Sequence, residues 1–338
     1  MYGIMYLNSE EFLSNFQKAI NELDHVTQVA EDLKKHEVKQ IFFTGCGGAF
    51  TKFVDLKPLM FKSLSVPFLI VSPEELSTSY LREIDAETLI IAGTKTGETK
   101  ELISTLNKIK NIQTECRIIS FIGDDGSTLE GQGLISDRIR SIDTDVNLIE
   151  LGWLLQNLTS HNSLEELTNK KEQLVKAGAQ IVEGIEALIP KSLGKVNNTN
   201  LDELQMWVGS GRLWGEVCCY ANYLMEEIQR IKAQAVHSNE FFHGPFEIID
   251  EHQSVNVVVN SDSNREHDLR VVDFVKNFAK DPLIIDMNSF KFEGLDEEMK
   301  SFVESYALNH YFDTLYNMYS VKTGRTAATR RYYRLLNY

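Results

Sequence analysis

Short apolar runs recur along the first half of the chain, and their lack of alternation limits the folds that the chain can adopt. Val, Ile and Phe dominate the runs, and polar residues do not alternate with them, which is typical of parallel strands covered on both faces. Segments with helical spacing, beginning with Glu10 to Lys35, precede and separate the runs. The runs are Gln40–Thr44, Pro67–Ser72, Thr88–Ala92 and Arg117–Ile122. Their order predicts a doubly wound α/β unit.

A second α/β unit is expected after a long polar helix. Ser163 and Glu166 form a capping box at the start of this helix, and Pro190 and Gly194 are expected to close it after Leu188. The later strands are expected at Leu204–Val208, Ser254–Val259 and Pro282–Asp286. The predicted division is an N-terminal helix with the first unit at 1–160, a linking helix at 161–195, a second unit at 196–325 and a tail at 326–338.

The charge balance and the cysteines restrict the partners and the compartment. The chain has 34 Lys and Arg against 49 Asp and Glu, a net charge of −15, which disfavours nucleic acid or an anionic membrane as the main partner. Its four cysteines have neither CxxC spacing nor a secreted-type framework, and no apolar run approaches about 20 residues. The sequence therefore predicts a cytoplasmic protein.

Neither a nucleotide cofactor nor a metal is predicted. The glycine turns Gly45–Gly48 and Gly209–Gly211 lack the GxGxxG spacing, and no GxxxxGK[ST] motif occurs. The histidines are scattered, and His237 and His243 have no partner at zinc-ligand spacing.

The segment Thr94–Thr99 lies between an expected strand and an expected helix at Lys100 to Lys110. Free backbone N–H groups and the positive end of the helix dipole favour an anion there, and hydroxyl groups add donors without charge. The segment therefore predicts a phosphate site, and an ordinary Thr cap of a helix is the alternative.

Glu227 lies on a predicted helix from about Arg212 to Gln234. At about 100° per residue it falls on the edge of an apolar stripe, where partial desolvation makes a carboxylate a better base. The alternative is an exposed Glu whose stem covers the core. The stripe consists of Leu213, Val217, Ala221, Leu224, Ile228 and Ile231.

His243 precedes Gly244-Pro245, which breaks regular structure and holds the imidazole on a rigid turn. A His in this place is a candidate general acid or base, and a satisfied core residue is the alternative.

These motifs resemble those of sugar isomerase (SIS) domains. Thr94–Thr99 is similar to their Ser-Gln-Ser-Gly-Glu-Thr phosphate loop, His243–Pro245 to their HGP element, and Glu227 stands at the family's catalytic spacing before His243. The tail, Arg330-Arg331-Tyr332-Tyr333 and onward to Tyr338, resembles that of fructoselysine-6-phosphate deglycases. The chain also resembles the isomerase half of glucosamine-6-phosphate synthase. The resemblance implies two tandem SIS domains, each a mostly parallel, flavodoxin-like sheet flanked by helices.

The resemblance also assigns roles to residues. It implies that Glu227 moves a proton between sugar carbons and that His243, contributed by a neighbouring subunit, assists ring opening. The phosphate would be held by Gly47, Gly48, Thr94, Lys95, Thr96, Gly97 and Thr99. Gly48 and Ala49 replace the Ser or Thr of relatives, and Lys95 replaces a Gln. Arg331, Tyr332 and Tyr333 would close over the substrate, with a basic surface end as the alternative.

The expected activity is cleavage of a phosphorylated fructosamine into glucose 6-phosphate and a free amino acid. No cofactor is needed for this reaction, and a homodimer or larger homo-oligomer with shared sites is expected. The alternatives are another SIS aldose–ketose or amino-sugar phosphate isomerase, or a non-catalytic sugar-phosphate sensor.

Overall fold

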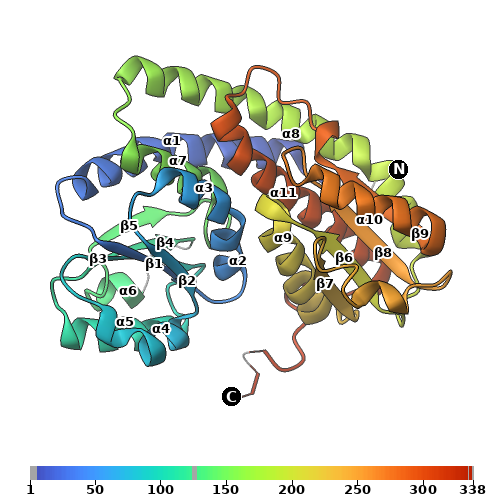
Figure 1. Cartoon of the computed structure of the whole chain (residues 1–338), viewed down its shortest axis with the longest axis horizontal. Coiled ribbons are helices and arrows are strands. Elements are labelled where there is room, and N and C mark those ends of the chain that lie inside the picture. The colour runs from blue at the N-terminus through green and yellow to red at the C-terminus, as the bar shows by residue number, and fades with distance from the viewer. Residues whose placement is uncertain (1–5, 124–127, 334, 337–338) are drawn as a thin grey trace. The chain divides into compact units, whose positions relative to one another are not determined.

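A computed structural model describes residues 6–123, 128–333 and 335–336 of the chain (Figure 1). It divides into two compact units. The first unit comprises Glu10–Gly178 with Gly294–Tyr306, and the second comprises Met1–Ser9, Ala179–Glu293 and Ala307–Tyr338. Arg334 and Tyr338 of the expected tail lie outside the described residues.

The first unit has a five-stranded parallel sheet in the order β2-β1-β3-β4-β5. Its strands are β1 (Gln40–Gly45), β2 (Phe68–Val71), β3 (Thr88–Thr94), β4 (Arg117–Ile122) and β5 (Asp137–Arg140). Its helices are α1 (Ser9–Leu33), α2 (Gly48–Asp55), α3 (Lys57–Ser63), α4 (Pro73–Ser79), η1 (Leu81–Glu83), α5 (Lys100–Ile112), α6 (Thr128–Gly131) and α7 (Leu148–Thr159).

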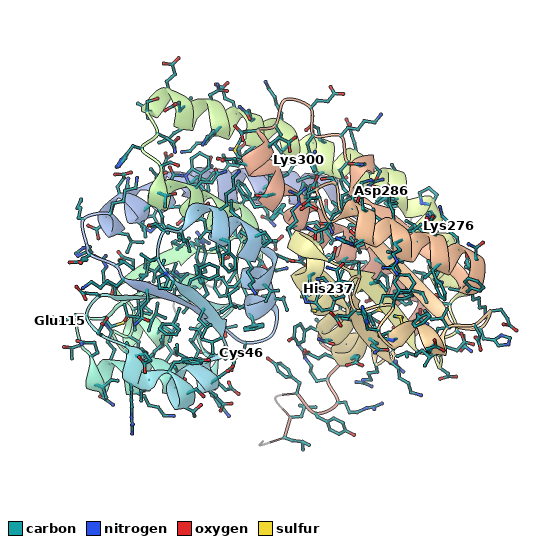
Figure 2. The ribbon with its side chains drawn as sticks, in the orientation of Figure 1. Cys46, Glu115, His237, Lys276, Asp286 and Lys300 are labelled. Carbon is teal, nitrogen blue, oxygen red and sulfur yellow. The ribbon has the colours of Figure 1, made fainter. Side chains whose placement is uncertain are left out.

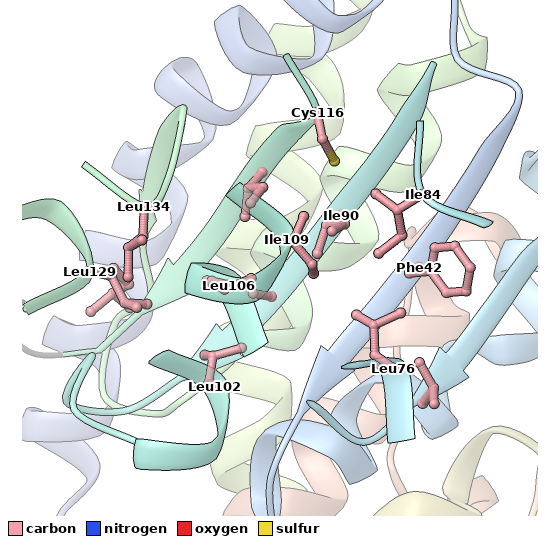
Figure 3. Packing of buried hydrophobic residues seen from close by; sticks show 14 residues of the cluster. Phe42, Leu76, Ile84, Ile90, Leu102, Leu106, Ile109, Cys116, Leu129 and Leu134 are labelled. Carbon is pink, nitrogen blue, oxygen red and sulfur yellow. The ribbon is translucent and has the colours of Figure 1, made fainter. Parts of the chain in front are cut away.

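Helices cover both faces of this sheet, as its mostly apolar interior strands require. Phe42 of β1 and Ile90 of β3 belong to one buried cluster with Leu102 and Leu106 of α5, which are one helical turn apart (Figure 3). The opposite face carries Phe43, whose ring centroid lies 5.4 Å from that of Phe53 in α2. The helices that follow β1 and β3, α2 and α5, therefore pack on opposite faces of the sheet.

The second unit has a four-stranded parallel sheet in the order β7-β6-β8-β9, which repeats the order β2-β1-β3-β4 of the first. Its strands are β6 (Gln205–Gly209), β7 (Ala233–His237), β8 (Ser254–Val259) and β9 (Lys280–Asp286). Its other elements are η2 (Gly211–Leu213), α9 (Trp214–Cys219), η3 (Tyr220–Gln229), η4 (Pro245–Ile248), α10 (Arg265–Phe278) and η5 (Met287–Ser289). Two long helices, α8 (Leu164–Asn198) and α11 (Glu297–Thr323), contribute residues to both units.

Aromatic packing closes one face of the second sheet. Tyr220 lies with its ring centroid 4.6 Å from that of Trp207 on β6 and 4.3 Å from that of Phe312 on α11. On the other face, Val271 and Val275 of α10 join the buried valines of β8. The second unit therefore has a core of its own.

The two tandem parallel α/β units confirm the predicted fold class, but two strands were not predicted. β5 and β7 are edge strands, each paired with a single neighbour. Both carry polar residues because edge positions remain partly exposed, so neither shows a continuous apolar run.

The capping box at the start of α8 is confirmed, and the predicted end of this helix is wrong. Ser163 N donates to Oε2 of Glu166 at 2.7 Å, and Glu166 N donates to Oγ of Ser163 at 3.2 Å. The helix then continues through Pro190 to Asn198. Lys195 binds the carbonyl oxygen of Asp281 at 2.6 Å, so tertiary contacts beyond the proline hold the last turns in place.

No helix in the described ranges combines the length and apolar character that are needed to cross a membrane.

Candidate functional site

The two expected phosphate loops leave neighbouring strands of the first sheet. β1 lies between β2 and β3, so the strand order reverses there. The loop after β1 leads to α2 and contains Gly47 and Gly48, and the loop after β3 leads to α5 and contains Thr94–Thr99. Ligands of doubly wound sheets bind at the carboxyl ends of strands at this reversal. The first unit therefore brings the two predicted loops together.

Thr99 precedes α5, yet its side chain makes no capping hydrogen bond. Its hydroxyl instead lies 3.1 Å from the hydroxyl of Thr94, whose oxygen also accepts the N–H of Gly97 at 3.2 Å. Gly97 has φ +70°, a conformation that favours glycine. An ordinary Thr cap is therefore wrong, and the first turn of α5 keeps backbone N–H groups for an anion.

The other two candidates on this loop are more accessible. Thr96 is half-buried, and its hydroxyl accepts the N–H of Glu98 at 3.3 Å. Lys95 is exposed, so its ammonium group can approach a bound anion from solvent.

The loop after β1 offers only backbone N–H donors at Gly48, because the carboxylate of Asp145 fills the space that a side chain would need. A Cβ added to Gly48 would lie 2.6 Å from Oδ2 of Asp145, which excludes a Ser or Thr without movement of that side chain. Oδ1 of Asp145 accepts the N–H of Val146 at 3.0 Å. Gly47, at φ +60°, precedes α2 without a side-chain cap. Asp145 was not identified in the sequence, because nothing in the local pattern brings it to this loop.

The thiol of Cys46 lies on the same loop and is marked in Figure 2. Burial, with smaller contributions from Glu101 and Glu74, raises its pKa to about 11. The loop thus presents a neutral thiol at neutral pH.

The corresponding reversal in the second sheet is filled by the protein's own polar groups. The buried carboxylate of Asp268 accepts hydrogen bonds from the hydroxyl groups of Ser210 and Ser238 at 2.7 and 2.5 Å. It also accepts the backbone and side-chain N–H groups of Asn260 at 2.9 and 2.8 Å. A carboxylate already occupies this position, so the second sheet is a poor phosphate site at the same place.

Another acidic residue of the second unit, Asp286, is also paired within the protein, with Arg265. Its two oxygens accept hydrogen bonds from Arg265, each at 2.7 Å, at the carboxyl end of β9 (Figure 2). The pair joins β9 to the first turn of α10, which is a structural role.

Glu227 lies on η3, which is a π-helix rather than the predicted α-helix. The buried residues there recur about every four positions: Tyr220 and Ala221, then Met225, then Ile228 and Gln229. Consequently Met225 is buried, whereas Leu224 of the predicted stripe is only half-buried. π-Helical turns occur frequently at functional sites.

The side chain of Glu227 is 33% exposed, and its Oε1 accepts a hydrogen bond from Nη1 of Arg330 at 2.6 Å. The structure therefore shows an ion-paired carboxylate rather than one that is desolvated by an apolar stripe. Its neighbour Glu226 turns elsewhere and accepts the N–H of Ala233 at 3.3 Å.

A cavity of about 460 Å³ lies between the end of η3 and the C-terminal segment. We call it the tail pocket, and it is lined by Glu226, Glu227, Arg230, Ile231, Lys232, Arg330, Arg331, Tyr332 and Tyr333. Its volume is within the range of small-molecule sites. The structure thus brings Glu227 together with all three predicted closing residues.

The sequence did not identify Arg230 and Lys232 as lining residues. Arg230 ends η3 in the left-handed conformation at φ 54°, which is uncommon for a residue with a side chain. The predicted helix ran through both positions, so the turn at Arg230 was not predicted.

His243 does not line the tail pocket. It is exposed on a turn, where its backbone N–H donates to the carbonyl oxygen of Glu240 at 3.0 Å. Gly244 follows at φ +129°. The alternative of a satisfied core histidine is therefore wrong.

Within the described ranges, no three His, Cys, Asp or Glu side chains gather closely enough to hold a metal ion.

Comparison with known proteins agrees with this architecture. Residues 36–143 match the family model of the SIS domain. The chain is 23% identical over 309 residues to fructosamine deglycase FrlB of Bacillus subtilis, which covers 89% of this chain and 93% of the relative.

Solved structures share the fold at lower identity. A candidate phosphosugar isomerase from Bacillus subtilis superposes with a TM-score of 0.84 at 19% identity, covering 95% of this chain and 100% of the other. Tagatose-6-phosphate ketose/aldose isomerase from Escherichia coli gives a TM-score of 0.71 at 15% identity, with 96% and 95% covered. The C-terminal domain of glucosamine-fructose-6-phosphate aminotransferase from Francisella tularensis gives 0.70 at 16% identity, with 96% and 98% covered. Residues 36–143 therefore match the SIS domain, and the solved structures show that the chain as a whole shares the fold of these phosphosugar-related proteins.

Proposed function

We propose that the protein hydrolyses a phosphorylated fructosamine to glucose 6-phosphate and a free amino acid. The observation that carries this proposal is the placement of Glu227 in the wall of the tail pocket, beside a cationic C-terminal segment. The similarity to a fructosamine deglycase along 89% of the chain supports the same substrate class.

The proposed reaction begins with proton transfer. Glu227 removes a proton from C1 of the open-chain sugar, the electron pair forms a C1–C2 double bond, and the C2 carbonyl oxygen takes up a proton. Return of a proton to C2, with loss of the proton on the amine nitrogen, gives an aldose-type imine at C1 and leaves the C2 hydroxyl group in place. Water adds to the imine carbon, and the amine leaves with a proton. The net change is fructosamine 6-phosphate plus water to glucose 6-phosphate plus amine.

The residues of the first unit anchor the substrate in this proposal. The phosphate is bound by backbone N–H groups of the two loops, by the hydroxyl groups of Thr94, Thr96 and Thr99, and by Lys95. The phosphate is remote from C1 and C2, so its binding energy can position the reacting carbons. His243 assists ring opening in a neighbouring subunit, which makes a homodimer the smallest complete assembly.

The four cysteines of the chain are free, which is typical of a reducing compartment, and we place the reaction in the cytoplasm.

Incubation with fructoselysine 6-phosphate tests the proposed function. Glucose 6-phosphate is measured with a coupled dehydrogenase, and lysine is measured by chromatography in the same samples. We expect equal amounts of both products from the wild-type protein. Conversion of tagatose 6-phosphate or fructose 6-phosphate without amine release from the fructosamine would instead favour an aldose–ketose isomerase. Binding of both compounds without conversion of either would favour a sensor.

A further inference from the structure

The charge of the tail pocket is opposite to that of the chain as a whole. The chain carries a net charge of −15. The pocket, by contrast, has four cationic side chains against two carboxylates. The six charged residues are Glu226, Glu227, Arg230, Lys232, Arg330 and Arg331.

Contacts within the pocket leave most of this positive charge without a carboxylate partner. Arg330 is paired with Glu227 at 2.6 Å. Arg230 donates from Nη2 to the carbonyl oxygen of Thr329 at 3.1 Å, a contact that does not neutralise its charge. Within the described part of the chain, no carboxylate forms an ion pair with Lys232 or Arg331, and both side chains are exposed.

The tyrosines of the pocket help to hold the arginines. The guanidinium carbon of Arg330 lies 4.7 Å from the ring centroid of Tyr333, and that of Arg331 lies 5.9 Å from the ring centroid of Tyr332. Stacking of this kind reduces the freedom of the guanidinium groups and leaves their N–H edges for an acceptor.

From this arrangement we infer that the tail pocket is a subsite for the carboxylate of the departing amino acid, and that Lys232 and Arg331 determine the preference for it. The inference rests on the proposed function, because it assigns the amine side of the same substrate. An amine without a carboxylate leaves this positive charge uncompensated, whereas an amino acid supplies the missing anion.

Two matched substrates test the subsite: the fructosamine 6-phosphates of glycine and of glycinamide. They have nearly the same shape and differ in one negative charge. We expect the wild-type protein to use the glycine compound with a kcat/KM roughly tenfold or more above that of the glycinamide compound. The ratio falls toward one in Lys232→Gln and Arg331→Gln, and it decreases with added salt. Lys276→Gln, on the exposed face of α10, keeps the wild-type ratio (Figure 2).

The outcomes separate the subsite from the proposed function. Equal kcat/KM values for the two compounds in the wild-type protein overturn the subsite and leave the deglycase function standing. If neither compound is cleaved, the proposed function fails, and calorimetry on the same wild-type protein then compares the two dissociation constants. Tighter binding of the glycine compound by about tenfold supports the subsite, and equal binding overturns it.

Discussion

The hydroxyl oxygens of Thr94 and Thr99 lie 3.1 Å apart across the turn between β3 and α5. Thr99 occupies the N-cap position of α5 without capping it. One hydroxyl group donates to the other, and both can turn to donate to a phosphate.

We expect Thr99→Val to raise KM roughly tenfold or more and to change kcat little. The variant keeps the β-branched shape and loses one hydrogen bond to an anion that is remote from the reacting carbons. Thr99→Ser should retain most of the affinity. Thr78→Val is the matched control, because the exposed Thr78 hydroxyl bonds only within α4 in the same unit. Steady-state kinetics decides, and an unchanged KM in Thr99→Val would remove that hydroxyl from the phosphate site.

Glu227→Gln should lower turnover by roughly 10² to 10⁴ while substrate binding persists, because the amide cannot accept the C1 proton. Glu226→Gln is the adjacent control, since its amide oxygen can still accept the N–H of Ala233. Single-turnover kinetics and calorimetry measure the two effects separately. Equal losses in both variants would point to damage of η3 and not to a missing base.

Continuous apolar runs allowed the interior strands to be predicted closely. β4 and β8 begin and end at the predicted residues, because both faces of each are covered and apolar residues dominate both runs. The polar residues inside them, Ser120 and Asn256, are themselves buried. The edge strands β5 and β7 were missed for the opposite reason, since a single neighbour and partial exposure permit polar side chains.

The surroundings of Glu227 could not be predicted from the α-helical period of 3.6 residues per turn. In the π-helix η3, Met225 takes the inner position that the predicted stripe gave to Leu224. Arg330 is 103 residues away in sequence, and local patterns do not report a contact of that length. The motif residues of the phosphate loop were identifiable because strand, turn and helix are consecutive there.

Asp268→Ala should destabilise the second unit by about 3–5 kcal/mol. Four N–H and O–H donors, from Ser210, Ser238 and Asn260, point at this fully buried carboxylate and would lose their acceptor. Urea unfolding measures the change. Asp273→Ala, at an exposed position on the same helix, should stay within about 0.5 kcal/mol of the wild type.

Asp268→Asn provides an intermediate case in the event that the alanine variant does not fold. It keeps the shape and one acceptor oxygen, so a smaller loss is expected. A loss below about 1 kcal/mol in both variants would contradict the role of Asp268 as the acceptor that holds this region together.

Cys46 should react slowly with iodoacetamide at neutral pH. Burial raises the pKa of its thiol from 9.0 to about 11, so between pH 7 and 8 the native protein holds roughly a hundredth of the ordinary thiolate fraction. Peptide mass spectrometry after timed labelling gives the rate. The same cysteine in urea-denatured protein is the control, and equal native and denatured rates would contradict the effect of burial.

Glu150→Gln should stabilise the first unit, and the gain should increase with pH. Glu150 is fully buried, its Oε1 accepts the N–H of Ile142 at 3.3 Å, and within the described ranges its Oε2 has no partner. Burial raises its pKa well above the ordinary 4.5. Below pH 4.5 the folded and unfolded states both hold the proton. Above it the unfolded state releases the proton and the folded state retains it, so the free energy of unfolding of the wild type falls as the pH rises.

The glutamine variant has no proton to release, so its free energy of unfolding does not fall with rising pH for this reason. We expect it to exceed the wild-type free energy of unfolding by about 1 kcal/mol or more at pH 8, with a smaller difference at pH 5, in urea titrations at the two pH values. Glu172→Gln, an exposed position on α8, is the control and should show no such trend. A difference for Glu150→Gln that is constant or shrinks toward pH 8 would mean that the buried carboxyl group does not keep its proton in the folded state.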